Sequence, residues 1–79
     1  MSRFSIKKGD LELTYGFDHA LGYFYDIVDL SKDEDSKEYL LEEKSYFINK
    51  MTRSEFSGVL SEWGAREDHL MSIALDLPF

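Results

Sequence analysis

The chain is predicted to fold as one α+β domain spanning residues 1–79. A small antiparallel sheet of three or four strands should come first, with two or three helices, mainly in the C-terminal part. Apolar and polar residues alternate near the N-terminus, which is typical of half-buried strands, whereas apolar residues recur at helical spacing after residue 51. Strands followed by helices in chain order favour helices packed on one face of an antiparallel sheet.

The N-terminal part predicts a β-hairpin. Apolar and polar residues alternate in residues 3–7 and again in residues 11–15. Between these two segments, Gly9 can adopt the positive φ that a tight turn needs. The stretch 16–22 begins and ends with glycine, and we expect it to be a loop.

Residues 23–30 predict the longest strand, because they are rich in aromatic and β-branched side chains. Tyr23 and Tyr25 lie on one face of this strand. Phe24 and Val28 lie on the other face. Since both faces carry bulky side chains, we expect the strand to be central in the sheet and covered on both sides.

The next part of the chain allows two interpretations. Residues 31–38 are polar throughout and predict a surface turn or the start of a helix. Residues 37–50 contain good helix formers, and Asp35 with Glu38 could form a capping box. However, the apolar stripe of such a helix is broken, so a short strand at 38–43, paired with the preceding strand, is the equal alternative.

Residues 51–64 predict a helix. Thr52 and Glu55 have the spacing of a capping box, and Gly64 is placed to end the helix. We expect Gly58 to allow close packing against the sheet. Met51 and Phe56 occupy the positions of a hydrophobic staple. The apolar stripe consists of Phe56, Val59, Leu60 and Trp63.

A second helix is predicted from residue 66 to residue 75, because Glu67 and Asp68 suit its positive N-terminal end and Pro78 follows it. His69 should lie on its exposed side. The expected buried stripe consists of Leu70, Ile73, Ala74 and Leu77.

Composition limits the classes of function. The net charge of −7 argues against direct nucleic-acid binding, which needs a basic face. The absence of cysteine favours a reducing cytoplasm. There is no stretch of 18 apolar residues, so we expect neither a membrane span nor a membrane partner.

The acidic segment 29–43 is the main functional candidate. It contains seven carboxylates and two lysines, hence a net charge of −5 out of the total of −7. Charge of this density favours either a merely solvated loop or a surface that binds a basic protein partner. A calcium site is disfavoured because the loop glycine is missing. The candidate partner-binding residues are Asp29, Asp33, Glu34, Asp35, Glu38, Glu42 and Glu43.

No pattern predicts an enzyme. His19 and His69 are far apart in the sequence and match no metal-binding motif. Asp18 and His19 are adjacent, but no motif marks a serine or cysteine nucleophile beside them. Glycine-rich phosphate-binding motifs are absent. We therefore expect no catalytic residues, no metal and no cofactor.

In its size, strong acidity and lack of cysteine, the chain resembles the small acidic anti-CRISPR proteins of phages and mobile elements. The stretch YGFDHALGYFYDIVD and the ending ALDLPF also look like small bacterial proteins. The resemblance implies a non-enzymatic inhibitor in the cytoplasm of a host bacterial cell, which mimics DNA and blocks a basic groove of a CRISPR surveillance complex. The alternative is a protein–protein interaction domain that binds through apolar surface around Tyr23, Tyr25 or Phe79.

Overall fold

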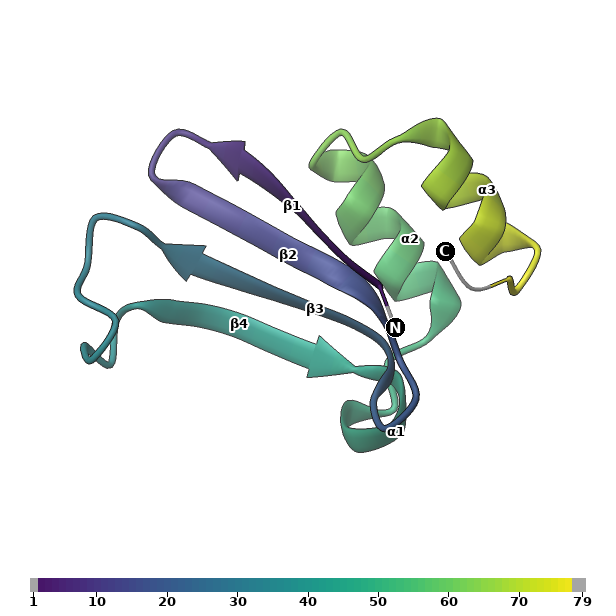
Figure 1. Ribbon diagram of the computed structural model, residues 1–79, viewed down its shortest axis with the longest axis horizontal. Helices are drawn as coiled ribbons and strands as arrows, with labels where there is room; N and C mark the ends of the chain where they lie inside the picture. The colour runs from purple at the N-terminus through teal and green to yellow at the C-terminus, as the bar shows by residue number, and fades with distance from the viewer. Residues whose placement is uncertain (1, 78–79) are drawn as a thin grey trace.

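The computed structural model describes residues 2–77, in which a four-stranded antiparallel sheet precedes three helices (Figure 1). The strands lie in the order β1-β2-β3-β4, so consecutive strands are neighbours. This arrangement confirms the predicted fold class. The elements are β1 (Ser2–Lys8), β2 (Leu11–Asp18), β3 (Gly22–Asp29), β4 (Leu40–Ser45), α1 (Tyr46–Asn49), α2 (Arg53–Glu62) and α3 (Glu67–Ala74).

The N-terminal hairpin is confirmed, with Gly9 in its turn at φ 63°. The loop predicted over 16–22 is wrong, because β2 continues through Gly16, which pairs with Arg3 of β1. A Cβ atom at Gly16 would collide with the backbone carbonyl oxygen of Ser2. Gly16 is therefore needed because the backbone of β1 approaches it closely within the sheet. The local sequence pattern is equally compatible with a glycine in a loop.

The strand alternative for the ambiguous segment is correct. β4 pairs with β3 in an antiparallel register that places Lys44 opposite Tyr25 and Glu43 opposite Asp26. The helical interpretation of residues 37–50 is wrong except for the single turn of α1. Pairing with β3 satisfies the backbone of this segment, whereas a helix with a broken apolar stripe could not have buried one face.

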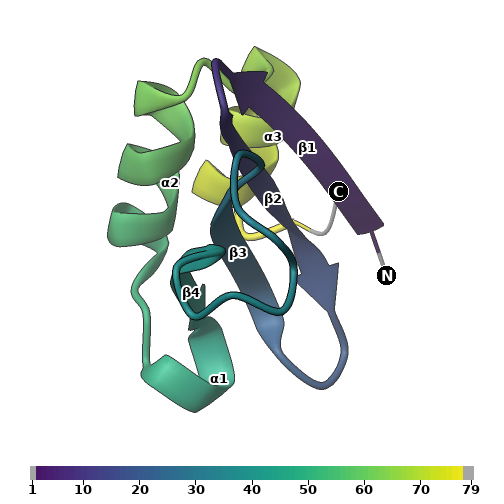
Figure 2. The same ribbon diagram turned by 90° about the vertical axis from the view of Figure 1, so that its left-hand side faces the viewer.

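Helices α2 and α3 pack on one face of the sheet (Figures 1 and 2). Phe56 of α2 is fully buried and stacks on Tyr23, with 5.3 Å between ring centroids. Three core tyrosines direct their hydroxyl groups to polar partners at the edge of the core, which avoids buried unpaired groups. The buried core consists of Leu13, Tyr15, Tyr23, Tyr25, Met51, Phe56, Leu60, Ala65 and Ile73.

Strand β3 is central, as predicted, but the expectation that it is covered on both sides is wrong. Tyr23 and Tyr25 face the helices, and because side chains alternate along a strand, Phe24 and Asp26 point to the other face. In the described part of the chain, neither α2 nor α3 lies over that second face (Figure 2). We call it the open face.

The predicted limits of α2 are confirmed. The Thr52 side chain accepts a hydrogen bond from the Glu55 backbone N–H at 3.1 Å, and Gly64 ends the helix at φ 76°. The Glu55 carboxylate contacts the Thr52 hydroxyl at 3.3 Å, so one of the two reciprocal bonds of a capping box is formed. Close packing at Gly58 is not found, because nothing lies within 4 Å of a Cβ built there.

The buried stripe of α3 differs from the prediction. His69, expected on the exposed side, is buried, and its Nδ1 atom lies 2.7 Å from the Tyr15 hydroxyl, with which it shares a hydrogen bond. Ala74 and Leu77 are exposed. The predicted stop at Pro78 lies outside the described residues. A histidine that pairs with a core tyrosine can be buried, which hydropathy alone does not show.

The two glycines make a matched test of the fold. Replacing Gly58 by Ala should stabilise the protein by about 1 kcal/mol, because alanine favours the helix and the site is open. Replacing Gly16 by Ala should destabilise it by about 1–3 kcal/mol through the collision with Ser2. Urea unfolding of both variants measures the two changes. Equal effects of the two substitutions would contradict this placement of Gly16.

Candidate binding surface

The loop between β3 and β4 is held by backbone hydrogen bonds. The Asp29 N–H donates to the Tyr39 carbonyl at 2.7 Å, which closes the base of the loop. The Leu30 N–H donates to the Asp10 carbonyl at 2.6 Å and links the loop to the β1–β2 turn. These bonds give the acidic loop a defined position at one end of the sheet (Figure 1).

Asp29, the first of the predicted binding residues, builds this loop. Its carboxylate accepts hydrogen bonds from the Ser31 hydroxyl at 2.6 Å and the Ser31 backbone N–H at 2.9 Å. Because both bonds favour the ionised form, they lower the pKa of Asp29 below its ordinary value. Asp29 therefore shapes the turn as an acceptor within its own segment.

Three adjacent carboxylates of the loop, Asp33, Glu34 and Asp35, are exposed, and we call them the acidic tip. Within residues 2–77 no ion pair involves them. Lys32 instead pairs with Glu38 at 3.4 Å. Lys8, at the same end of the sheet, donates to the Glu62 carbonyl at 3.1 Å. The negative charge of the acidic tip is thus directed to solvent.

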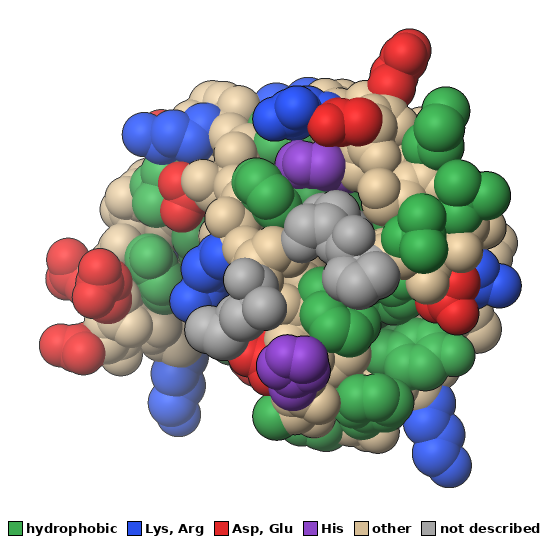
Figure 3. Space-filling model, turned by 45° about the vertical axis from the view of Figure 1, so that its right-hand side comes forward, with side chains coloured by type: hydrophobic (Ala, Val, Ile, Leu, Met, Phe, Trp, Pro, Cys, Tyr) green, Lys and Arg blue, Asp and Glu red, His purple; other side chains and the backbone are tan. Residues whose placement is uncertain are grey.

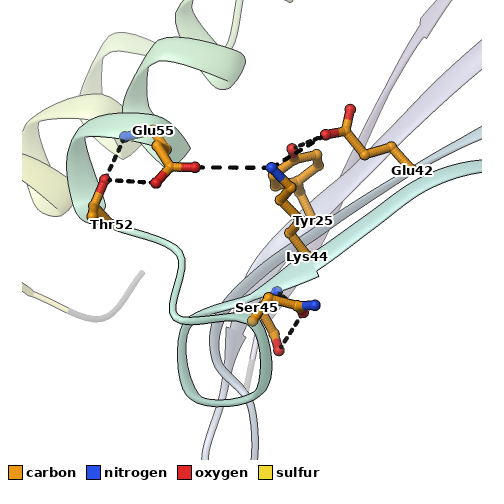
Figure 4. Close-up of polar contacts among 7 residues, drawn as sticks. Tyr25, Glu42, Lys44, Ser45, Thr52 and Glu55 are labelled. Carbon is orange, nitrogen blue, oxygen red and sulfur yellow. Dashed lines mark hydrogen bonds and ion pairs between the residues drawn. The ribbon is translucent and has the colours of Figure 1, made fainter.

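Glu42 and Glu43 lie on opposite faces of β4, as consecutive strand residues must. Glu42 accepts a hydrogen bond from the Tyr25 hydroxyl at 2.8 Å. Lys44 lies 3.7 Å from Glu42 and 3.9 Å from Glu55 of α2 (Figure 4). Burial and this acceptor raise the pKa of Tyr25, so its hydroxyl stays a donor. Glu42 thus contacts a core tyrosine, and Lys44 links β4 to α2.

The seven predicted carboxylates therefore do not form one surface. Asp29 shapes the loop, Glu38 pairs with a lysine, and Glu42 belongs to the network beside α2. The acidic tip remains together as an outward-facing group. Glu43 lies apart from it, on the open face of the sheet, where its cross-strand neighbour is Asp26.

Sequence reasoning missed a groove on the open face. It has a volume of about 370 Å³ and lies between the sheet and α1. The Arg3 guanidinium lies 5.8 Å from the centre of the Phe24 ring, on the same face as Asp26 and Glu43. The signal in the sequence was an aromatic and an acidic side chain, Phe24 and Asp26, on the face of β3 that carries no tyrosine.

The carboxyl group of Asp26 is in an unfavourable environment. Its partial burial raises its pKa above the ordinary value, and the neighbouring carboxylates of Glu43 and Glu12 raise it further. The positive charge of Arg3 acts in the opposite direction. Because carboxylates directly opposite each other across two strands repel, the charged form of Asp26 opposes folding at neutral pH.

Exposed apolar side chains occupy other parts of the surface. Phe47 and Ile48 of α1 are 60% and 70% exposed, and Met71 of α3 is 64% exposed. Figure 3 shows hydrophobic side chains gathered on the right of the view, with acidic side chains projecting at the left and others lying beside the hydrophobic ones. Tyr23 and Tyr25, around which the alternative hypothesis placed an apolar binding surface, are buried in the core, and Phe79 lies outside the described residues.

Asp18 and His19 do not form an acid–base pair. The Asp18 carboxylate accepts the Ala20 N–H at 2.7 Å and thereby stabilises the β2–β3 turn. His19 is exposed, and its ring lies 6.1 Å from that of Phe17. Within the part of the chain that the structure describes, no three acidic or histidine side chains are grouped to hold a metal ion.

No protein-family model matches the chain, and neither the curated proteins nor the solved structures gave a match. None of the helices in residues 2–77 is long and apolar enough to cross a membrane.

Replacing Asp26 by Asn should stabilise the fold by about 0.5–1 kcal/mol at pH 7, because it removes one of two facing carboxylates. Since the folded-state pKa of Asp26 is raised, the destabilisation is present above that pKa and is relieved as the pH falls through it. The advantage of the variant should thus shrink in acid. Urea unfolding at pH 7 and pH 4 measures it.

Asp35→Asn is the control, because it removes the same charge from an exposed loop. If both variants change stability equally at pH 7, net charge rather than the position of Asp26 is responsible.

Proposed function

We propose that this chain is a non-enzymatic binding protein whose acidic tip enters a basic, nucleic-acid-binding groove of a protein partner and blocks it. The observation that carries the proposal is the acidic tip itself, formed by Asp33, Glu34 and Asp35. These three exposed carboxylates have no ion-pair partner among residues 2–77 and stand on a hydrogen-bonded loop.

The physical basis is electrostatic complementarity. Carboxylates attract a cationic groove over long range and then accept charge-assisted hydrogen bonds from its arginine and lysine side chains. The loop is anchored at its base by the bond from Asp29 to Tyr39, which reduces the entropy lost on binding. Lys32 and Lys37 flank the tip and leave the three carboxylates contiguous in the sequence.

A CRISPR surveillance complex is the specific partner that we propose, since the chain resembles small acidic anti-CRISPR proteins in size and charge. The DNA-binding channel of an RNA-guided effector is positively charged and contacts the nucleic acid through its backbone. A row of carboxylates can substitute for phosphates in such a channel. In this role the protein competes with target DNA and carries out no reaction.

The triple variant Asp33→Asn, Glu34→Gln, Asp35→Asn should weaken binding to a purified, guide-loaded CRISPR effector about tenfold or more, equivalent to about 1.4 kcal/mol. It should also flatten the salt dependence of binding, because fewer exposed charges remain to be screened. Competition against fluorescent target DNA at two salt concentrations measures both effects.

The matched control carries an equal loss of negative charge away from the acidic tip. If this control loses as much affinity as the tip variant, total charge rather than the tip drives binding. If neither variant changes affinity or its salt dependence, the proposal is wrong. The control substitutions are Glu62→Gln, Glu67→Gln and Asp68→Asn.

A second candidate function is protein recognition through apolar surface, and one observation favours it. Phe47 and Ile48 project from α1 with 60% and 70% of their surface exposed, which is unusual for adjacent large apolar residues of a small domain. Binding of this kind should persist at high salt, since screening weakens exposed ion pairs far more than apolar burial. A Phe47→Ser, Ile48→Ser variant would then lose binding while the acidic-tip variant keeps it.

A further inference from the structure

The open face of the sheet contains a groove that can receive a cationic side chain. It is lined by Phe24 and Asp26 of β3, by Glu43 of β4, and by Ile48 and Asn49 of α1. At about 370 Å³ it falls within the roughly 300–1,000 Å³ typical of small-ligand sites. The groove therefore combines apolar contact with acidic groups in one concave site.

The register fixes the acidic groups of this groove. Asp26 of β3 and Glu43 of β4 are direct cross-strand partners on the same face, so their Cβ atoms lie roughly 4.5–5.5 Å apart. Arg3 is the cation that faces them from β1, while Lys44 points to the opposite face, where it pairs with Glu42. Glu12 and Lys7 are cross-strand partners of opposite charge farther along this face. Asp26 and Glu43 therefore share the single positive charge of Arg3, and negative charge remains for a ligand.

The chain's own Arg3 shows which ligand chemistry fits. Its guanidinium lies 5.8 Å from the centre of the Phe24 ring, which is the range of a cation–π contact. A planar guanidinium can stack on an aromatic ring and donate to two carboxylates at once, whereas an ammonium group cannot do both equally well. Arg3, Phe24 and two residues of α1, Ile48 and Asn49, all line the same groove.

We propose that this groove is a second contact site, in which an arginine side chain of the basic partner stacks beside Phe24 and is held by Asp26 and Glu43. The inference rests on the proposed function, because a basic partner surface is the source of the arginine. It adds a site of defined chemistry on the sheet, separate from the acidic tip.

The test uses N-acetyl-arginine N-methylamide as the probe in an NMR titration of the whole chain. We expect saturable shifts of the backbone amide signals of Phe24, Asp26 and Glu43. The citrulline analogue has nearly the same shape without the charge, and it should leave these signals unchanged. Shifts confined to residues 31–38, or equal shifts with citrulline, would overturn the proposal.

A pair of matched double variants separates the groove from the acidic tip. The double variant Asp26→Asn, Glu43→Gln should weaken binding of the arginine probe at least tenfold. The double variant Asp33→Asn, Asp35→Asn should change the affinity for the probe by no more than about twofold. Unchanged affinity in the groove variant would overturn the inference. If the tip variant still weakens binding to the CRISPR effector in that case, the groove proposal fails alone and the proposed function stands.

Discussion

One-sided burial of the tyrosine face determines how the rest of the molecule is arranged. Tyr15, Tyr23 and Tyr25 pack beneath α2 and α3, and their hydroxyl groups leave the core toward His69, Asp76 and Glu42. Because side chains alternate along a strand, Phe24 and Asp26 must point to the face that α2 and α3 do not cover. The core and the open groove are therefore two consequences of the same register.

The sequence predicted those parts of the fold that depend on local patterns. The hairpin around Gly9 follows from the alternation of apolar and polar residues, and the helix that begins after Thr52 follows from its capping residues. Both patterns involve residues that are close together in the sequence. The errors lie at residues whose position depends on contacts with segments that are distant in the sequence. Gly16 looks like a loop glycine until β1 is placed beside it, and His69 looks exposed until its distance to Tyr15 is known.

The candidate surface was only partly predictable for the same reason. The charge of residues 29–43 is visible in the sequence, but local hydrogen bonds decide which carboxylates remain free for a partner. The Ser31 hydroxyl donates a hydrogen bond to the Asp29 carboxylate, and the Tyr25 hydroxyl donates one to the Glu42 carboxylate across the β3–β4 pair. These contacts leave the acidic tip as the one contiguous group, while the approach of Glu43 to Asp26 is set by a register that composition does not show.

The acidic tip and the Asp26–Glu43 pair differ in their effect on the stability of the folded protein. The acidic tip is solvated, so its charge is compatible with folding and is screened by salt. Asp26 is partly buried opposite Glu43, where repulsion is stronger and Arg3 compensates it in part. Carboxylates held in such unfavourable surroundings are frequent at functional sites, because a cationic ligand relieves the repulsion when it binds. A site on the open face would thus gain affinity from the same repulsion that lowers the stability of the free protein.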